Sequence, residues 1–161
     1  MADREKASAE QWTICEKGHT HWGSNGAAGL LLRYAPYEGK PMFLLQQRSR
    51  WVDHGGKWGI PGGAIHGGES PEEAAKRETE EEIGPLPRYR VTGVEVQDCG
   101  GGWKFHIVNA DVGSPFPAFS VLETDATGWF TQEEMRNLFL HPGLRRWREE
   151  HDSRNTSDIS F

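Results

Sequence analysis

The sequence lacks several features that would place it outside the ordinary globular class. Its 161 residues include only two cysteines, Cys15 and Cys99, so we expect no disulfide framework. No apolar run is long enough to span a membrane, and the first residues form no apolar signal segment. Internal repeats and low-complexity tracts are absent as well. These absences predict one cytoplasmic domain that does not associate with a membrane.

Basic charge is also in short supply. The net charge is −6, which argues against a nucleic-acid polymer as partner because no basic surface would offset the repulsion of phosphates. Hydrophobic residues make up 35% and charged residues 26%, which is ordinary for a globular protein. We therefore expect a flexible N-terminus over 1–10, one domain over 11–151 and a flexible tail over 152–161.

What the sequence does contain is a strong helix after a glycine-rich loop. Ser70 is suited to cap the free backbone N–H groups, Pro71 fits the first helical position, and Glu73 completes a capping box. Gly84 followed by Pro85 ends the helix. The pattern predicts about four turns between these signals.

Three carboxylates lie along one edge of this helix. Glu78 and Glu82 are four residues apart, and Glu81 is three from Glu78. Carboxylates packed this closely repel one another unless a cation lies between them, and oxygen-only ligands suit Mg2+ or Mn2+. Arg77, four residues before Glu81, is placed to orient its carboxylate. Taken alone, the glutamates favour a solvated acidic surface, because glutamate-rich surface helices are common.

The preceding loop favours the metal interpretation. Gly62 and Gly63, and then Gly67-Gly68, allow the backbone to approach a ligand closely. Glu69 falls between loop and helix, where it can brace the loop. The complete pattern has a fixed spacing: Gly63-x5-Glu69-x7-Arg77-Glu78-x2-Glu81-Glu82-x-Gly84.

This pattern resembles the Nudix box and matches each of its fixed positions. Thr79 and Pro85 occupy two loose apolar positions of the motif. The resemblance implies a mixed α/β/α sandwich with a catalytic loop–helix–loop that hydrolyses a diphosphate linked to another group. It is weaker over the wider range 26–150. Glu78, Glu82, Glu81 and the Gly62 carbonyl are the implied metal ligands, with Arg77 as their orienting partner.

The rest of the chain supplies the sheet. Residues 26–34 and 42–47 predict a hairpin of two strands, and 88–98 and 103–111 predict two more. A capping box at 131–134 predicts a helix over 133–139 that His141-Pro142 breaks, and 144–151 predicts a short final helix.

Substrate contacts are expected outside the motif. The resemblance implies that the end of the second strand points at the substrate, so Gln47, Arg48 and Arg50 are candidates for phosphate or base contacts, with ordinary surface charge as the alternative. Trp58 and Trp103 are the candidate stacking aromatics, although Trp58 suits core packing better.

A further glutamate fits the place of a metal ligand or base in the family. Glu123 lies on a predicted loop before Trp129-Phe130, and Asp125 is its alternative. Glu81 and Glu123 both remain candidates for the general base.

The substrate class depends on weaker signals. The segment LLQQR before the motif most resembles nucleoside-triphosphate hydrolases of the family. Cys99-Gly100-Gly101 stands where the ADP-ribose subgroup carries a proline, and Trp103 is the aromatic nearest the position of a tyrosine in the dinucleoside-polyphosphate subgroup. A Nudix sensor that does not hydrolyse is the rival class, and a homodimer is common in the family.

The N-terminal segment has its own pattern. Cys15, His19 and His21 could belong to a zinc site, but no second pair follows at ligand spacing. The favoured interpretation is a strand and turn with incidental histidines. The alternative is that His21 or Trp22 overhangs the substrate.

Overall fold

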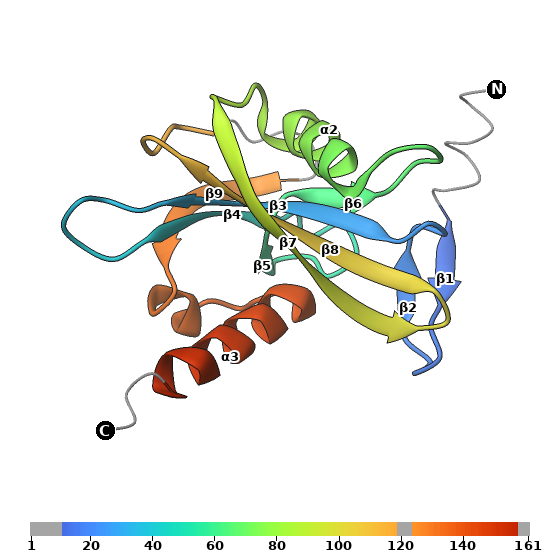
Figure 1. The fold of residues 1–161 in the computed structure, drawn as a ribbon. Helices are drawn as coiled ribbons and strands as arrows, with labels where there is room; N and C mark the ends of the chain where they lie inside the picture. Colours follow the sequence, from blue (N-terminus) through green and yellow to red (C-terminus); the bar gives the residue numbers. More distant parts are fainter. Residues whose placement is uncertain (1–10, 119–123, 158–161) are drawn as a thin grey trace.

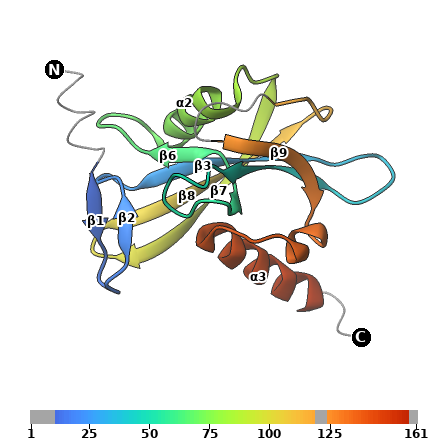
Figure 2. The ribbon, with the colours of Figure 1, turned by 180° about the vertical axis from the view of Figure 1, so that it is seen from behind.

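The computed structural model describes residues 11–118 and 124–157. A mixed sheet lies between two helices, α2 (Pro71–Ile83) on one face and α3 (Pro142–Ser157) on the other (Figures 1 and 2). The hydrogen-bonded order is β5-β4-β3-β8-β7, with β6 added to β3 and β9 added to β4. The strands are β3 (Ala27–Tyr34), β4 (Met42–Arg48), β5 (Trp58–Gly59), β6 (Gly62–Ala64), β7 (Tyr89–Gly100), β8 (Trp103–Val112) and β9 (Thr124–Thr131). This architecture confirms the predicted sandwich.

A single parallel pairing between the described strands makes this sheet mixed. β3 runs parallel to β8, from Ala27 opposite Phe105 to Arg33 opposite Asp111, whereas its other ladders are antiparallel. β3 and β4 pair as the predicted hairpin. A parallel pair needs a crossover connection, and here the crossover contains α2.

The apolar run in β3 is explained by burial on both faces. Leu30 and Leu32 belong to the cluster that packs against Ala74 and Ala75 of α2. Leu31, which points the opposite way, belongs to the cluster beneath α3. All three leucines are about 1% exposed. The central strand therefore holds α2 and its glutamates at a fixed height over the sheet.

The C-terminal region corrects three predictions. The predicted capping box forms: the Thr131 N–H donates to the Glu134 carboxylate at 3.0 Å, and the Glu134 N–H donates to the Thr131 hydroxyl at 3.2 Å. It begins only a short 3-10 helix, η1 (Glu134–Asn137). Pro142 is the first residue of α3, because proline fits a helix start as well as a break. The expected tail is wrong for residues 152–157, which continue this helix. Neither helix is long and apolar enough to cross a membrane within the described ranges.

A separate hairpin precedes the sheet. β1 (Trp12–Ile14) and β2 (Thr20–Trp22) pair antiparallel and form a two-stranded sheet of their own. The hairpin lies beside the end of the sheet where β7 turns into β8 (Figures 1 and 2). The predicted leading strand and turn are thus confirmed as a hairpin.

Candidate active site

The predicted helix signals act as expected in α2. The Ser70 hydroxyl accepts a hydrogen bond from the backbone N–H of Glu73 at 3.1 Å, and Pro71 is the first helical residue. At the other end the N–H of Gly84 donates to the Glu80 carbonyl at 3.1 Å. Gly84 has a φ of 87°, in the left-handed region that glycine tolerates. These signals set where the glutamates lie over the sheet.

Thr79 explains how a polar residue occupies an apolar position of the motif. The side chain is fully buried, and its hydroxyl donates to the Ala75 carbonyl at 2.6 Å. A threonine that satisfies its hydroxyl within its own helix presents its methyl group to the core. The departure at this position therefore leaves the helix geometry intact.

Arg77 connects the loop to the helix. Its Nε and Nη2 atoms donate to the two oxygens of Glu69, both at 2.8 Å, and Nη2 also donates to the Ala64 carbonyl at 2.9 Å. Its Nη1 atom donates to Glu78 at 2.7 Å and more weakly to Glu81 at 3.5 Å. A planar guanidinium fits a carboxylate in this two-point manner, and lysine does not.

The electrostatics follow from these contacts. The hydrogen bonds from Arg77 lower the pKa of Glu69, which also accepts the His66 N–H at 2.8 Å. The same bonds to Glu69 raise the pKa of Arg77 far above its ordinary value, so both groups are ionised. Glu69 is therefore a brace for the loop, as the sequence indicated.

Glu82 is held against the sheet by two donors. The side-chain amide of Gln46 donates to its Oε2 atom at 2.6 Å, and the backbone N–H of Gly62 donates to the same oxygen at 3.1 Å. Burial nevertheless raises the pKa of Glu82 to about 8. Within the described part of the chain no hydrogen bond reaches Oε1. This carboxylate lacks enough positive charge around it and leaves one oxygen for a ligand.

Sequence reasoning missed Gln46. Its amide oxygen accepts the hydroxyl of Thr124 at 3.0 Å while its nitrogen donates to Glu82, so a fixed relay runs from β9 through β4 to α2. Gln46 is only 2% exposed. Side chains alternate along a strand, so its neighbour Gln47 faces the other way and donates to the Gly56 carbonyl at 3.2 Å. Because neighbouring side chains of a strand point to opposite faces, the sequence indicated that one of these two glutamines faces α2, but not which one.

Glu78 packs against the glycine-rich loop. Its carboxylate lies where a side chain on Gly63 would be, and burial raises its pKa in spite of the hydrogen bond from Arg77. Glu81 is more open, with 57% of its side chain exposed. Glu78 and Glu82 are thus two carboxylates whose ionised forms need more positive charge than the protein supplies. Such a donor set fits a hard divalent cation, for which the ionised carboxylates and the Gly62 carbonyl remain the predicted ligands.

Arg48 is within electrostatic reach of this site, whereas Arg50 is occupied elsewhere. Burial dominates the pKa of Glu82, but the charge of Arg48 is one of the smaller influences that lower it. The Arg48 Nε atom donates to the Asp53 carbonyl at 2.8 Å, which shapes the following loop. The exposed Arg50 guanidinium lies 5.0 Å from the centre of the Trp51 ring.

The two tryptophans proposed for stacking are packing residues in this structure. Trp58 meets the Phe130 ring edge to face at 5.0 Å, and its backbone is hydrogen-bonded to Phe139 and His141. Trp103 is 9% exposed and stacks on His21 at 3.8 Å, so that face of the indole is covered. Packing was the favoured interpretation for Trp58. For Trp103 the prediction of stacking on the substrate is corrected, because His21 of the N-terminal hairpin stacks on its ring instead.

The loop after β4 contains basic groups that the sequence did not single out. Lys57 lies 3.3 Å from His54, whose φ of 55° is unusual for a residue with a side chain. The His54 ring meets the His141 ring at 4.7 Å. Burial, followed by the charge of His54, lowers the pKa of His141 to about 3 and keeps it neutral. Arg48, at the start of this loop, is the group there whose charge acts on Glu82.

Glu123 and its alternative Asp125 were the predicted metal ligand or base outside the motif. Glu123 lies outside the described residues, so its role as metal ligand or base stays a prediction. Asp125 is exposed on β9.

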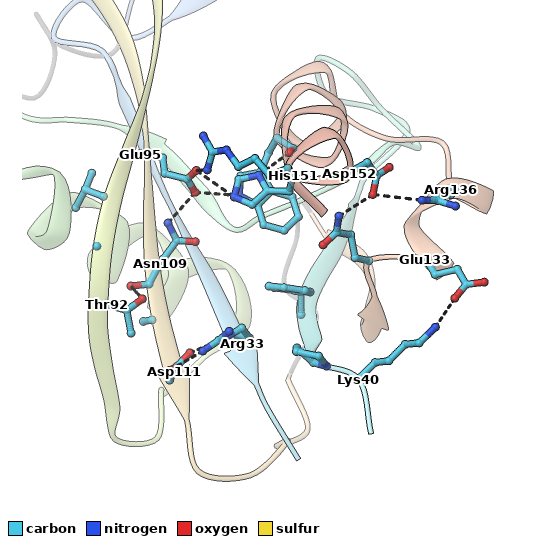
Figure 3. Close-up of a pocket in the computed structure, with 18 residues that line it drawn as sticks. Arg33, Lys40, Thr92, Glu95, Asn109, Asp111, Glu133, Arg136, His151 and Asp152 are labelled. Atoms are coloured by element: carbon cyan, nitrogen blue, oxygen red, sulfur yellow. Dashed lines mark hydrogen bonds and ion pairs between the residues drawn. The ribbon is translucent and has the colours of Figure 1, made fainter. Parts of the chain in front are cut away.

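A large hollow lies on the opposite face of the sheet. It measures about 870 Å3 and is lined by residues of β3, β4, β7, β8 and α3 and of the segments 40–41 and 132–136 (Figure 3). Its charges are paired within the wall, as in Arg33 with Asp111 at 2.8 Å and Lys40 with Glu133 at 2.6 Å. Since the glutamates of α2 lie across the sheet from it, we place the chemistry at α2 and not in this hollow.

The fold and the site together define the class of protein. The NUDIX domain model matches residues 25–151, and the chain belongs to the Nudix hydrolase family. It is therefore a hydrolase of the pyrophosphohydrolase type, as the resemblance implied.

Individual relatives agree with this assignment. A Mycobacterium tuberculosis protein named "Putative 8-oxo-dGTP diphosphatase 3" is 36% identical over 149 residues, which are 89% of this chain and 69% of the relative. The crystal structure of the Mycobacterium smegmatis Nudix hydrolase RenU is 33% identical, with a TM-score of 0.81 over 94% of this chain and 98% of that one. A Caenorhabditis elegans Ap4A hydrolase structure, at 22% identity and a TM-score of 0.63 over 81% and 98% of the two chains, shows the shared fold.

Proposed function

We propose that the protein is a Mg2+-dependent hydrolase of nucleoside triphosphates, and that modified triphosphates are its preferred substrates. The observation that carries this proposal is the arrangement of Glu82. Glu82 is a half-buried residue whose carboxylate has its pKa raised to about 8 and is held on one oxygen by Gln46 and Gly62, so it is prepared for a cation within a complete Nudix motif. The name of the M. tuberculosis relative supports the substrate class.

The residues of α2 fit the metal that the family uses. Glu78, Glu81 and Glu82, with the Gly62 carbonyl, would hold Mg2+, and Mn2+ suits the same oxygen donors. When bound, the divalent cation neutralises the diphosphate oxygens of the substrate and lowers the pKa of a coordinated water.

The protein side chains supply position and proton transfer. Arg77 fixes the directions of Glu69 and Glu78 through bonds of 2.8 and 2.7 Å, respectively, and Gln46 fixes Glu82. Glu81 is accessible enough to accept the proton of the attacking water, and Glu123 is the alternative base. Water attacks one phosphorus, the P–O bond to the leaving diphosphate breaks, and the water proton passes to the base.

The basic groups beyond β4 are the proposed contacts of the substrate phosphates. Arg48 acts electrostatically on Glu82, and Lys57 lies in the same loop beside His54. Positive charge next to a site of carboxylates is needed because a triphosphate must approach without strong repulsion. Gln47 and Arg50 stay candidates for contacts with the rest of the nucleotide.

A substrate panel tests the proposal. The purified full chain would be incubated with 8-oxo-dGTP, dGTP, ADP-ribose and a dinucleoside polyphosphate, with Mg2+ or Mn2+, and products separated by anion-exchange chromatography. We expect the monophosphate and pyrophosphate from the triphosphates, and kcat/KM for 8-oxo-dGTP at least about tenfold above that for ADP-ribose. Faster cleavage of ADP-ribose or of the dinucleoside polyphosphate would refute the substrate class.

A matched pair of variants separates hydrolysis from folding. Glu82→Gln keeps the shape of the side chain but removes its charge, and we expect a loss of roughly 10²-fold or more in kcat. Glu80→Gln changes an exposed carboxylate on the same helix and should keep normal turnover. A folded, metal-binding protein that turns over no member of the panel would favour the non-hydrolytic sensor instead.

A further inference from the structure

The N-terminal hairpin presents a cysteine and two histidines on one side. Its turn is closed by two backbone hydrogen bonds, from the N–H of Cys15 to the His19 carbonyl at 3.0 Å and from the N–H of Gly18 to the Cys15 carbonyl at 2.9 Å. Cys15 and His19 therefore stand opposite each other. His21 is two residues after His19, and alternate residues of a strand share a face. Three potential metal ligands thus project from the same face of the hairpin.

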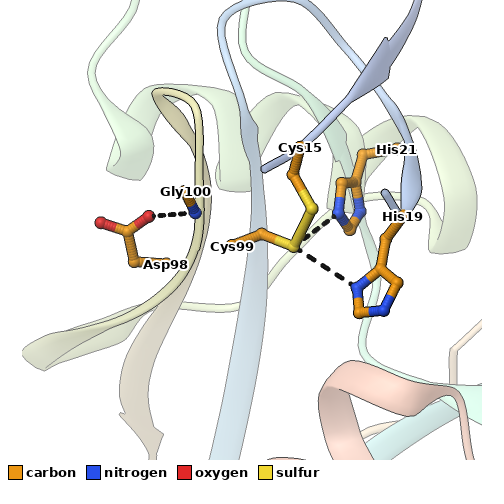
Figure 4. The surroundings of a disulfide bond; sticks show 6 residues. All are labelled: Cys15, His19, His21, Asp98, Cys99 and Gly100. Carbon is orange, nitrogen blue, oxygen red and sulfur yellow. Dashed lines mark hydrogen bonds between the residues drawn. A yellow bond between two sulfur atoms is a disulfide. The ribbon is translucent and has the colours of Figure 1, made fainter. Parts of the chain in front are cut away.

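A distant segment supplies a fourth ligand. Cys99 lies near the end of β7, beside the turn over Gly100–Gly102 where all three glycines have positive φ. Its Sγ atom lies 3.1 Å from Nε2 of His21 and 3.5 Å from Nδ1 of His19 (Figure 4). The potential ligand atoms of the four side chains lie within 4.8 Å of one another. Zinc was disfavoured from sequence because this partner is 84 residues from Cys15.

The size of the cluster suits one zinc ion. Zinc binds cysteine sulfur at about 2.3 Å and histidine nitrogen at about 2.0 to 2.1 Å in a tetrahedron, whose ligand atoms are then about 3.3 to 3.8 Å apart. The two sulfur–nitrogen distances given above are close to this range. The two sulfurs, which are joined in the structure, would have to move apart to reach it. Both cysteines are buried, whereas His19 is exposed and His21 half-buried. The ion would therefore bind at the edge of the protein with its sulfur ligands turned inward.

A disulfide between the two cysteines does not explain why both histidine rings point at Cys99. The sulfurs of Cys15 and Cys99 are in contact and are joined as a disulfide in the structure (Figure 4). A disulfide uses only the sulfurs. Yet both imidazoles direct a ring nitrogen at Cys99, and the His21 ring is fixed in that orientation by stacking on Trp103 with an angle of 10° between the planes. The convergence of all four donors is explained by a shared ion.

We propose that Cys15, His19, His21 and Cys99 bind one structural zinc ion when the cysteines are reduced. Binding would release one proton from each thiol, giving two thiolate and two neutral imidazole ligands around Zn2+. Four protein ligands close the coordination sphere, so the site has no open position for catalysis. It is distinct from the glutamate site on α2.

The zinc would attach the hairpin to the domain. β1 and β2 share no ladder with the main sheet, and a two-stranded hairpin is marginally stable alone. Their packing rests on a small cluster of Cys15, Ala27, Cys99 and Trp103. One ion with ligands from the hairpin and from β7 would hold two segments together that the small apolar cluster joins only weakly.

Metal and thiol content test the proposal together. The full chain would be purified with reductant, loaded with zinc in excess Mg2+ to occupy the carboxylates, and dialysed before mass-spectrometric metal analysis. We expect one zinc per chain and two free thiols after denaturation without reductant. Replacement by Co2+ should give the visible absorption of a tetrahedral thiolate complex. No zinc would overturn the proposal, whether the thiols are free or joined as a disulfide.

Histidine variants distinguish the site from a disulfide. His19→Ala and His21→Ala should each lose the bound zinc, although both substitutions leave the two cysteines in place, and the exposed His19 can be changed without disturbing the core. His151→Ala in α3 is the control and should keep one zinc. Zinc retained by both hairpin variants would overturn the ligand assignment. None of these results depends on hydrolase activity, so they stand or fall separately from the proposed function.

Discussion

The carboxylate of Glu78 occupies the space in which a Cβ atom on Gly63 would lie. That atom would come within 2.5 Å of the Glu78 Cδ atom and 2.6 Å of Oε2. The fixed glycine of the motif and the first glutamate of the helix therefore form one steric unit. The loop lies close to α2 because this residue has no side chain.

Gly63→Ala should impair catalysis more than folding. The added methyl group must displace the Glu78 carboxylate, and a shift of about 1 Å in a catalytic group can cost roughly 10²-fold in rate. We expect a loss of that order in kcat, with a circular dichroism spectrum like that of the wild type. Gly93→Ala is the control, because its new Cβ atom would meet nothing within 4 Å. Equal activity of the two variants would show that Glu78 tolerates displacement.

The raised pKa of Glu82 should make the metal-free protein less stable as the pH rises. Burial raises this pKa from 4.5 to about 8. Between these values the folded state holds a proton that the unfolded state has released, so the free energy of unfolding should fall with increasing pH. The slope is at most about 1.4 kcal/mol per pH unit for one proton. Urea unfolding in a chelator between pH 5 and 8 would measure it.

Glu82→Gln is the control for this effect. An amide does not titrate, so the free energy of unfolding of the variant should fall less steeply with pH than that of the wild type. In the wild type, Mg2+ affinity should rise with pH and level off above about 8, because the cation requires the ionised carboxylate. Identical pH profiles for wild type and variant would contradict the assignment of the titration to Glu82.

Gln46→Leu tests the relay that sequence reasoning missed. The substitution removes the 2.6 Å hydrogen bond that orients Glu82 and leaves the Thr124 hydroxyl without its acceptor. We expect kcat to fall about tenfold, corresponding to about 1.4 kcal/mol, with a smaller change in KM. Gln97→Leu also removes a buried glutamine, one that donates to the Gly143 carbonyl in α3, and should leave kcat unchanged. If both variants fell equally, loss of stability would be the explanation.

Local signals in the sequence predicted the helix and the loop well. Ser70, Pro71 and Gly84 act on their own neighbours, so the bounds of α2 follow from the sequence without knowledge of the rest of the chain. Arg77 was expected to pair with Glu81, but its shorter bonds go to Glu69 and Glu78, because the loop brings Glu69 beside the guanidinium. Pairing of the hairpin β3–β4 depends on adjacent segments too and was predicted.

Contacts between distant segments were predicted less well. Whether Gln46 or Gln47 faces α2 depends on the register of β4 in the sheet, and a change of one residue exchanges the two faces. The partnership of Cys99 with His21, and the covering of Trp103, depend on a hairpin that packs across the end of the sheet. The helical residues 152–157 gain their structure by extending α3, which polarity alone did not reveal.

The parallel pairing of β3 with β8 also bears on how the chain folds. Ala27 pairs with Phe105, so the central ladder joins two strands that are separated in the sequence by β4, β5, β6, α2 and β7. Contacts of such large sequence separation slow folding, because loop-closure entropy is lost before the contacts form. We therefore expect α2 and the β3–β4 hairpin to gain structure early and the β3–β8 ladder to limit the folding rate. The glutamates would then reach their final positions over the sheet only in the last step of folding.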